Sequence, residues 1–321
     1  MAAIRSRSAS ASRSAWITFR APPTGCRSPD WPPPRPPCAA PSNSPRRFKP
    51  DLWRPTVIAE WLTSVLTPAS FEARRLGVVA EVVAVRARAR RQAKAWAPHL
   101  AACHQTILTA CQTVANPGSV AVLGAGWLLD VPFDALTRRF DQVLLIDAVV
   151  PRAVRARAGH AGALWQAHDL GGVLATLAAQ KGGARGQAPD VPRPAPFPEA
   201  VLAADLVISA NLLSQLAMAP RLWLDRHGAD LDTQDRLSRA LIEAHLEALG
   251  RCRGRVCLIS DFEREERGAP GGPQRFDLLF GARPRIDGQR WLWDLAPRGE
   301  AENGLSVRHK VMGGLLASPT P

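Results

Sequence analysis

The stretch Ser119-Val-Ala-Val-Leu123, directly followed by Gly124-Ala125-Gly126, decides the fold of this chain. A short run of β-branched and apolar residues predicts a buried strand. The two glycines after it let the backbone turn sharply and approach a bound molecule closely. We therefore expect a strand that ends in a glycine-rich turn.

Four further short apolar runs follow this strand, and segments of helical character separate them. They predict strands at residues 142–146, 163–166, 205–209 and 255–260. The clearest helix is expected over residues 232–250, where apolar residues recur at helical spacing. Strands that alternate with helices in this way predict a doubly wound, mostly parallel α/β sheet.

The last part of the chain has a different pattern. Residues 290–295 and 305–312 both have strand-like sequences, and the segment 297–304 between them is too short for a crossover helix. This spacing predicts an antiparallel hairpin at the C-terminus. Two Gly/Pro-rich stretches, 181–198 and 263–289, are expected to be mobile loops.

The segment before the first strand is helical in character. Apolar residues recur at helical spacing through residues 51–115, and Pro98 is expected to interrupt the pattern. Residues 1–50 are rich in Arg, Ser and Pro and are predicted to be disordered. We therefore expect a disordered segment at 1–50, a helical extension at 51–115 and a Rossmann-like domain at 116–321.

The origin of residues 1–50 has three interpretations. The lack of acids before Asp30 is similar to an organelle transit peptide, and Arg46-Arg47 is similar to a twin-arginine signal. The third interpretation is an upstream start codon that adds non-native residues. The Arg-, Ala- and Pro-rich composition is typical of a GC-rich bacterial coding sequence, which favours the third.

Composition narrows the class of protein. The chain has 321 residues, of which 46% are hydrophobic, and its apolar runs are far shorter than the roughly 20 residues of a membrane helix. The formal net charge of +13 lies mostly in residues 1–50, so it is weak support for a nucleic-acid partner, which stays open. The six cysteines lack metal-site spacing and are expected to be free thiols. We expect a soluble, cytoplasmic, bacterial protein without a metal site.

Several residues with ligand-binding chemistry follow the predicted strands. In a sheet of this kind, ligands bind at the carboxyl ends of the strands. Asp147 ends the second strand, about 20 residues after Gly126, where a carboxylate can accept hydrogen bonds from both ribose hydroxyls. Asp169 ends the third strand and could accept from an adenine amino group. The pattern predicts an adenosine-containing ligand, and the alternative is a tight turn with two surface acids.

These residues resemble the class I S-adenosylmethionine-dependent methyltransferases over residues 116–315. The resemblance is carried by Val-Leu-Gly124-Ala-Gly126, Leu-Leu-Ile-Asp147, His-Asp169-Leu and Asp205-Leu-Val-Ile-Ser-Ala-Asn211-Leu-Leu-Ser-Gln-Leu216. The C-terminal hairpin would supply that family's antiparallel seventh strand. A dinucleotide-binding fold would have a third glycine where this chain has Leu129.

The resemblance implies a seven-stranded sheet, S-adenosylmethionine as cofactor and a set of cofactor-binding positions. The glycine turn would line the methionine end, Asp147 would hold the ribose, Asp169 the adenine, and the end of the fourth strand would border the methyl group. The implied residues are Gly124, Ala125, Gly126, Asp147, Asp169, Ser209, Ala210 and Asn211.

The chain also departs from that family. The usual acid two residues before the first glycine is Val122 here, and a frequent third glycine is Leu128. Pro132 suits the first turn of a helix that starts late, and Asp130 is expected to cap it.

No catalytic group can be assigned from the sequence, because methyl transfer needs positioning more than a base. Asp261, at the end of the fifth strand, is the best-placed acid for a catalytic role. Histidines such as His309 are candidates for a general base by residue type only. His245 is expected to be structural. Arg221, Trp223, Arg226 and His227 are expected to face the entering acceptor, and Trp291 and Trp293 to anchor the hairpin.

The sequence thus predicts methyl transfer from S-adenosylmethionine to an unidentified acceptor, with the helical extension covering the cofactor or shaping the acceptor pocket. One alternative is a non-catalytic binding protein on the same fold, which the altered glycine loop motivates. Another is a nicotinamide-dependent oxidoreductase, against which Leu129 and the hairpin both count.

Overall fold

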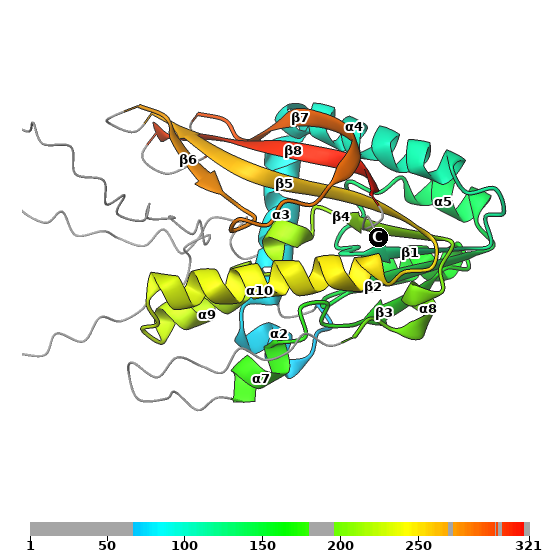
Figure 1. Cartoon of the computed structure of the whole chain (residues 1–321), viewed down its shortest axis with the longest axis horizontal. Helices are drawn as coiled ribbons and strands as arrows, with labels where there is room; N and C mark the ends of the chain where they lie inside the picture. The colour runs from blue at the N-terminus through cyan, green and yellow to red at the C-terminus, as the bar shows by residue number, and fades with distance from the viewer. Residues whose placement is uncertain (1–66, 180–195, 269–271, 299, 301–303, 318–321) are drawn as a thin grey trace, which may run out of the picture.

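The protein is built on one twisted, mostly parallel sheet (Figure 1). The computed structural model describes residues 67–179, 196–268, 272–298, 300 and 304–317. Within them the strands are β1 (Ser119–Leu123), β2 (Gln142–Asp147), β3 (Leu164–Ala167), β4 (Leu206–Ala210), β5 (Arg255–Arg267), β6 (Gln274–Asp277), β7 (Ile286–Ala296) and β8 (Ser306–Leu316). The sheet order is β3-β2-β1-β4-β5-β8-β7, and β6 pairs with β5 outside this path.

The sheet confirms the predicted fold class. Strands β1 to β5 are parallel, and β8 lies antiparallel between β5 and β7, as the predicted C-terminal hairpin requires. The main path has the seven strands that were expected, and β6 is an eighth, short strand that the sequence did not predict.

Helices cover both faces of the sheet because the central strands are apolar on both faces. The helices are α2 (Phe71–Arg75), α3 (Val78–Arg91), α4 (Ala93–Gln112), α5 (Phe133–Arg139), α6 (Arg152–His160), α7 (Leu174–Ala179), α8 (Glu199–Leu202), α9 (Met218–Arg226) and α10 (Leu231–Gly250). In β1, Val120 and Val122 pack with α4, α5 and α6, whereas Ala121 and Leu123 pack in a second cluster with α8 and α10. None of the helices among the described residues combines the length and apolar character needed to cross a membrane.

The N-terminal helices are joined to the rest of the molecule at two places. Helix α4 packs against β7 and β8, and its Trp96 donates a buried hydrogen bond of 3.0 Å to the carbonyl of Leu295. Helix α2 belongs to a third apolar cluster, with α7 and α9. Helix α3 connects α2 to α4, and its Val79 packs in the third apolar cluster, whereas its Ala89 packs in the first. This connection fixes α3 beside the carboxyl ends of the parallel strands.

Two local expectations are wrong. Pro98 lies inside α4, and the interruption comes earlier, at Gln92, which joins α3 to α4 with φ −105° and ψ 23°. A proline removes only one hydrogen bond from a helix, and the packing of the apolar stripe through Cys103 and Ile107 keeps α4 intact.

The stretch 263–289 is not a loop throughout, because β5 continues to Arg267, β6 spans Gln274–Asp277 and β7 begins at Ile286. Charged residues occupy that half of β5, so their pattern gives no apolar alternation. Residues 180–195 and 1–66, on which the other loop, the N-terminal segment and the start of the helical extension were predicted, lie outside the described residues.

Candidate functional site

A cavity of about 300 Å³ opens at the carboxyl ends of the parallel strands, where such sheets bind ligands. All but one of the predicted cofactor residues line it, and these are Gly124, Ala125, Gly126, Asp147, Asp169, Ala210 and Asn211. Ser209 does not line the cavity. Its hydroxyl lies 3.1 Å from Nε2 of His245 on α10, because successive residues of β4 point to opposite faces of the sheet.

The glycine turn is shaped by both its backbone and its neighbours. Gly124 and Gly126 have φ values of 75° and 45°, in the left-handed region that favours glycine. A Cβ on Gly124 would lie 2.9 Å from Cβ of Leu212, so a larger residue would also displace this neighbour. The amide of Gly126 donates a 2.8 Å hydrogen bond to Asp147, which holds the turn against the end of β2.

The carboxylate of Asp147 is half-buried and still has free acceptor positions. Its Oδ2 accepts from Gly126 and its Oδ1 accepts from the amide of Val149 at 3.2 Å. Burial raises the pKa of Asp147, and these backbone hydrogen bonds oppose that shift in part. A carboxylate has about four acceptor positions, so each oxygen can still accept a hydrogen bond from a ligand hydroxyl.

Asp169 organises the turn that leads into α7. Its Oδ1 accepts from the amide of Gly171 at 3.0 Å, and its Oδ2 accepts from the amide of Leu174 at 2.7 Å. This carboxylate therefore has a structural role at the cavity wall, and it also retains acceptor positions.

Leu128 explains one departure from the usual glycine pattern. It has a φ of 56°, so the backbone keeps the conformation that a glycine would adopt there. The left-handed conformation costs a non-glycine residue about 1–2 kcal/mol. The side chain of Leu128 is 5% exposed and packs in the main core, which offsets this cost.

Asp130 does not cap the next helix, as had been expected. Helix α5 begins after Pro132 without a side-chain cap, whereas Asp130 accepts a 2.7 Å hydrogen bond from Nδ2 of Asn211. Burial raises the pKa of Asp130, and the hydrogen bond from Asn211 opposes the shift. Asn211 itself has a φ of 51° at the end of β4, and this strained position is held by its side-chain contacts.

A β-bulge arranges the other end of the cavity. Asp261 of β5 is opposite Val311, but Arg264 is opposite His309, so Phe262 is an extra residue in the pairing with β8. Without the bulge, residues 261 and 264 would point to opposite faces of the strand. With it, Asp261, Arg264 and His309 all line the cavity.

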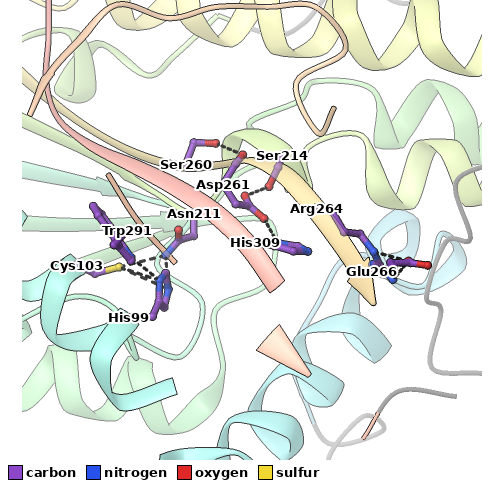
Figure 2. Close-up of polar contacts among 10 residues, drawn as sticks. All are labelled: His99, Cys103, Asn211, Ser214, Ser260, Asp261, Arg264, Glu266, Trp291 and His309. Atoms are coloured by element: carbon purple, nitrogen blue, oxygen red, sulfur yellow. Dashed lines mark hydrogen bonds and ion pairs between the residues drawn. The ribbon is translucent and has the colours of Figure 1, made fainter. Parts of the chain in front are cut away.

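Asp261 and His309 form a buried pair (Figure 2). Oδ2 of Asp261 lies 2.5 Å from Nδ1 of His309, and its Oδ1 accepts a short hydrogen bond from the hydroxyl of Ser214. Burial raises the pKa of Asp261, but the hydrogen bond and charge interaction with His309 and the bond from Ser214 lower it below its ordinary value overall. An ionised Asp261 is an acceptor only, so the Nδ1 of His309 carries the proton.

A second buried cluster lies beside this pair (Figure 2) and is centred on His99 of α4. Its ring stacks on Trp293 at 4.0 Å between centroids, and its Nδ1 accepts a 3.0 Å hydrogen bond from Nε1 of Trp291. Because an indole N–H only donates, the neutral imidazole carries its proton on Nε2, which lies 3.5 Å from Sγ of Cys103. Burial lowers the pKa of His99 to about 4, so the ring is neutral near pH 7.

The cavity wall has more acids than bases. Its acidic residues are Glu81, Asp130, Asp147, Asp169 and Asp261, and its guanidinium groups are Arg88 and Arg264. Both guanidinium groups are close to a carboxylate: Arg264 lies 2.6 Å from Glu266, and Arg88 lies 4.0 Å from Glu300. Burial raises the pKa of Glu81, as it does for Asp130 and Asp147, whereas Asp261 is held ionised. With both guanidinium groups close to a carboxylate, the ionised acids of the wall favour a cation over an anion.

The residues expected at the acceptor entrance lie elsewhere. Arg221 and Trp223 are buried in α9 and do not line the cavity. Arg221 approaches Asp235 at 2.5 Å and Ser238 at 3.2 Å, so its charge serves the contact between α9 and α10. The wall opposite the sheet comes instead from α3 and α4, including Val78, Val82, Val85, Trp96 and Leu100.

Comparison with known proteins finds similarity only among solved structures. No protein-family model and no curated protein matches the chain. Among solved structures, the 1,6-didemethyltoxoflavin-N1-methyltransferase of Burkholderia thailandensis, with bound 1,6-didemethyltoxoflavin and S-adenosylhomocysteine, is 16% identical over 77% of this chain and 92% of its own, with a TM-score of 0.36.

Two further solved structures are similar to the chain. The glycopeptide N-methyltransferase MtfA, complexed with S-adenosylmethionine, is 13% identical over 68% of this chain and 78% of its own, with a TM-score of 0.27. The YcgJ protein from Bacillus subtilis is 14% identical over 49% and 51%, with a TM-score of 0.24. Similarity at this level does not assign an activity to the chain.

Proposed function

We propose that this protein is an S-adenosylmethionine-dependent methyltransferase and that its acceptor binds in the same cavity as the cofactor. The observation that carries the proposal is the convergence of the glycine turn, Asp147, Asp169 and Asn211 on one cavity at the strand ends. The cavity has a volume within the range of small-molecule sites.

The chemistry of the cavity fits this cofactor. Gly126 lines the wall, and a Cβ on it would have Gly124 and Asp147 as its nearest neighbours, at 3.8 and 3.9 Å, so its hydrogen leaves space beside the carboxylate. Asp147 has acceptor positions for the two ribose hydroxyls, and the excess of acids suits a positively charged sulfur. When bound, the cofactor supplies a methyl group that is already activated for displacement.

A nicotinamide dinucleotide fits less well. Its pyrophosphate needs the N-terminus of a helix directly after the glycine turn. Here α5 begins only at Phe133, and the half-buried carboxylate of Asp130 lies between the turn and the helix. The acid excess at the cavity wall would also repel two phosphate charges.

In this proposal the protein binds the cofactor, orients the methyl group and the acceptor, and shields the reacting atoms from water. Asp147 fixes the ribose, the residues at the end of β4 border the methyl group, and the apolar side chains of α3 and α4 exclude water from the reacting atoms. Holding a nucleophile in line with an activated methyl group supplies much of the rate enhancement. The N-terminal helices are therefore proposed to be part of the site.

Calorimetric titration of the full chain tests the proposal. S-adenosylmethionine and S-adenosylhomocysteine should bind with dissociation constants of about 1 μM, whereas the nicotinamide dinucleotides should not bind. Asp147→Ala should weaken binding at least about tenfold, because it removes two hydrogen bonds to a charged group. Asp134→Ala removes an exposed acid on α5 and is the matched control.

The outcomes separate the alternatives. Binding of both compounds that is lost in Asp147→Ala, with thermal unfolding close to that of the wild type, supports the proposal. Binding of a dinucleotide alone would replace it with the oxidoreductase. If no adenosine compound binds, the protein is a non-catalytic member of the fold.

A further inference from the structure

The buried polar atoms on the cavity wall that have no hydrogen-bond partner among the described residues include Oδ1 of Asn211, Nε2 of His309 and Nε1 of Trp293. The last two belong to residues that face each other across β7 and β8. His309 is 7% exposed and Trp293 is 8% exposed. An unpaired buried polar atom costs about 1–3 kcal/mol, so two of them on one cavity call for a polar group of a ligand.

The two atoms have opposite hydrogen-bonding roles. Asp261 accepts from Nδ1 of His309, so the uncharged form of the ring presents a lone pair at Nε2. The indole Nε1–H of Trp293 can only donate. The two residues are opposite each other in the pairing of β7 and β8, and their rings are 5.8 Å apart in an edge-to-face arrangement.

A hydroxyl group of a ligand can form hydrogen bonds with both atoms. It can donate its proton to Nε2 of His309 while its oxygen accepts from Nε1–H of Trp293. An attacking amine would not, because its single lone pair is directed to the methyl carbon and cannot accept from the indole. A carboxylate or phosphate is disfavoured by the excess of acids on the wall, since the nearby cation Arg264 is already paired with Glu266.

The acidity of the hydroxyl narrows the class further. Proton transfer is most effective when donor and acceptor are close in pKa. A phenol-type hydroxyl ionises near pH 10, within reach of an imidazole, whereas alkyl alcohols are far weaker acids. The remaining wall near the pair is apolar, with Trp96, Leu278 and Leu295, and suits an aromatic body.

We propose that the methyl acceptor is a phenol-type hydroxyl on an apolar body, and that Nε2 of His309 is the general base that removes its proton. This inference rests on the proposed function and names its acceptor class. Asp261 and Ser214 are positioning residues that hold the ring, and Trp293 donates to the phenolic oxygen.

A lone pair of the phenolic oxygen forms the new bond to the methyl carbon as the carbon–sulfur bond breaks, and that electron pair leaves with the sulfur, which becomes a neutral thioether. The phenolic proton moves to Nε2 of His309. The imidazolium that forms is stabilised by Asp261 and returns its proton to solvent when the products leave.

Other charges also surround His309. Asp261 and Arg264 face it from β5, and His99 of α4 is close enough to interact with it electrostatically. Arg88 and Glu81 of α3 line the same cavity. Because Arg264 is paired and His99 is neutral near pH 7, Asp261 is the dominant charge at the ring.

A coloured phenol tests the inference without any cofactor. We would titrate 4-nitrophenol with pH in the presence of excess full-length protein and record the absorbance of the phenolate. Transfer of its proton to His309 should lower the midpoint of the bound probe by about one pH unit relative to the free probe. The ether 4-nitroanisole has no proton to transfer, and its affinity should be at least about tenfold lower.

Variants show whether His309 and Trp293 cause the shift of the 4-nitrophenol midpoint. His309→Asn should abolish the shift, and Asp261→Asn should reduce it. Trp293→Phe should weaken binding of the phenolate several-fold, because it removes the indole N–H but keeps an aromatic ring. His160→Gln, on the exposed end of α6, is the matched control and should leave the shift unchanged. Because His309 is buried, Trp293→Phe keeps the test open if His309→Asn does not fold.

The outcomes distinguish this inference from the proposed function. An unshifted midpoint in the wild type, no binding of 4-nitrophenol at millimolar concentration, or an equal shift in His309→Asn would overturn the phenol site. Calorimetry with S-adenosylmethionine is the separate arm. If that compound binds and the midpoint does not shift, only the acceptor class is wrong, whereas a shift without cofactor binding contradicts the proposed function alone.

Discussion

The stability of this protein should depend on pH through His245, which is buried in α10. Its Nε2 lies 3.1 Å from the hydroxyl of Ser209, and its ring packs edge-on against Phe197. Burial lowers the pKa of His245 to about 4, from 6.5 when it is exposed to water. The unfolded chain therefore binds a proton at mildly acidic pH that the folded chain does not.

The sign and size follow from proton linkage. The folded pKa is the lower one, so stability falls as the pH drops below about 6.5, and the loss is complete near pH 4. At pH 5 the solution is about 1.5 pH units below the pKa of the unfolded state. The free energy of unfolding is therefore about 2 kcal/mol lower than at pH 7.5, at roughly 1.4 kcal/mol per pH unit. His99 should add a loss of similar size, because burial lowers its pKa to about 4 as well.

Urea denaturation of the wild type and of His245→Gln at several pH values measures this contribution. Burial raises the pKa of Asp130 and of Asp147, which acts in the opposite direction, so the difference between the two proteins is the informative quantity. The variant should gain about 2 kcal/mol relative to the wild type from pH 7.5 to pH 5. Ile242→Val, on the same helix, should cost about 1 kcal/mol at every pH. A gap between wild type and His245→Gln that stays constant to within about 0.5 kcal/mol would refute the reasoning.

Three other substitutions should change stability or local opening. Gly254→Ala should cost about 2 kcal/mol or more in the free energy of unfolding, because the new Cβ would lie 2.2 Å from the carbonyl oxygen of Ala204, and an unchanged urea midpoint would contradict this. Gly159→Ala meets no atom within 4 Å inside α6 and should instead stabilise by about 0.5 kcal/mol in the same assay. Trp127→Phe removes the 2.7 Å hydrogen bond to the carbonyl of Val82, and amide exchange in α3 should accelerate about fivefold, whereas α10 should not change.

The sequence predicted the parallel part of the sheet well because of what those strands bury. β1 was predicted with its observed bounds, β2 ends one residue later than predicted, and β4 is shifted by one residue, since strands buried on both faces are continuous apolar runs between polar ends. The same strand ends carry Gly124, Asp147 and Asn211, so the position of the cavity followed from the fold.

The rest depended on contacts that no local pattern reports. The second half of β5 is charged, and ion pairs such as that between Arg264 and Glu266 replace the apolar signal of a strand. His309 could not be oriented from the sequence because the bulge at Phe262 changes which residues of β5 face it. The alternation of β4 turns Ser209 toward His245, on the face opposite the cavity.

The bulge at Phe262 also determines the charge that β5 presents to the cavity. Up to Asp261 the strand follows one alternation, and from Glu263 onward it follows the other. In an unbulged strand that kept Phe262, Glu263 and Glu265 would face the cavity and the guanidinium of Arg264 would leave it. Deleting Phe262 would instead leave Arg264 two residues after Asp261, so both would still face the cavity in a regular ladder. The extra residue is therefore an insertion that the cavity wall tolerates, because the bulge keeps the same side chains of β5 directed toward the site.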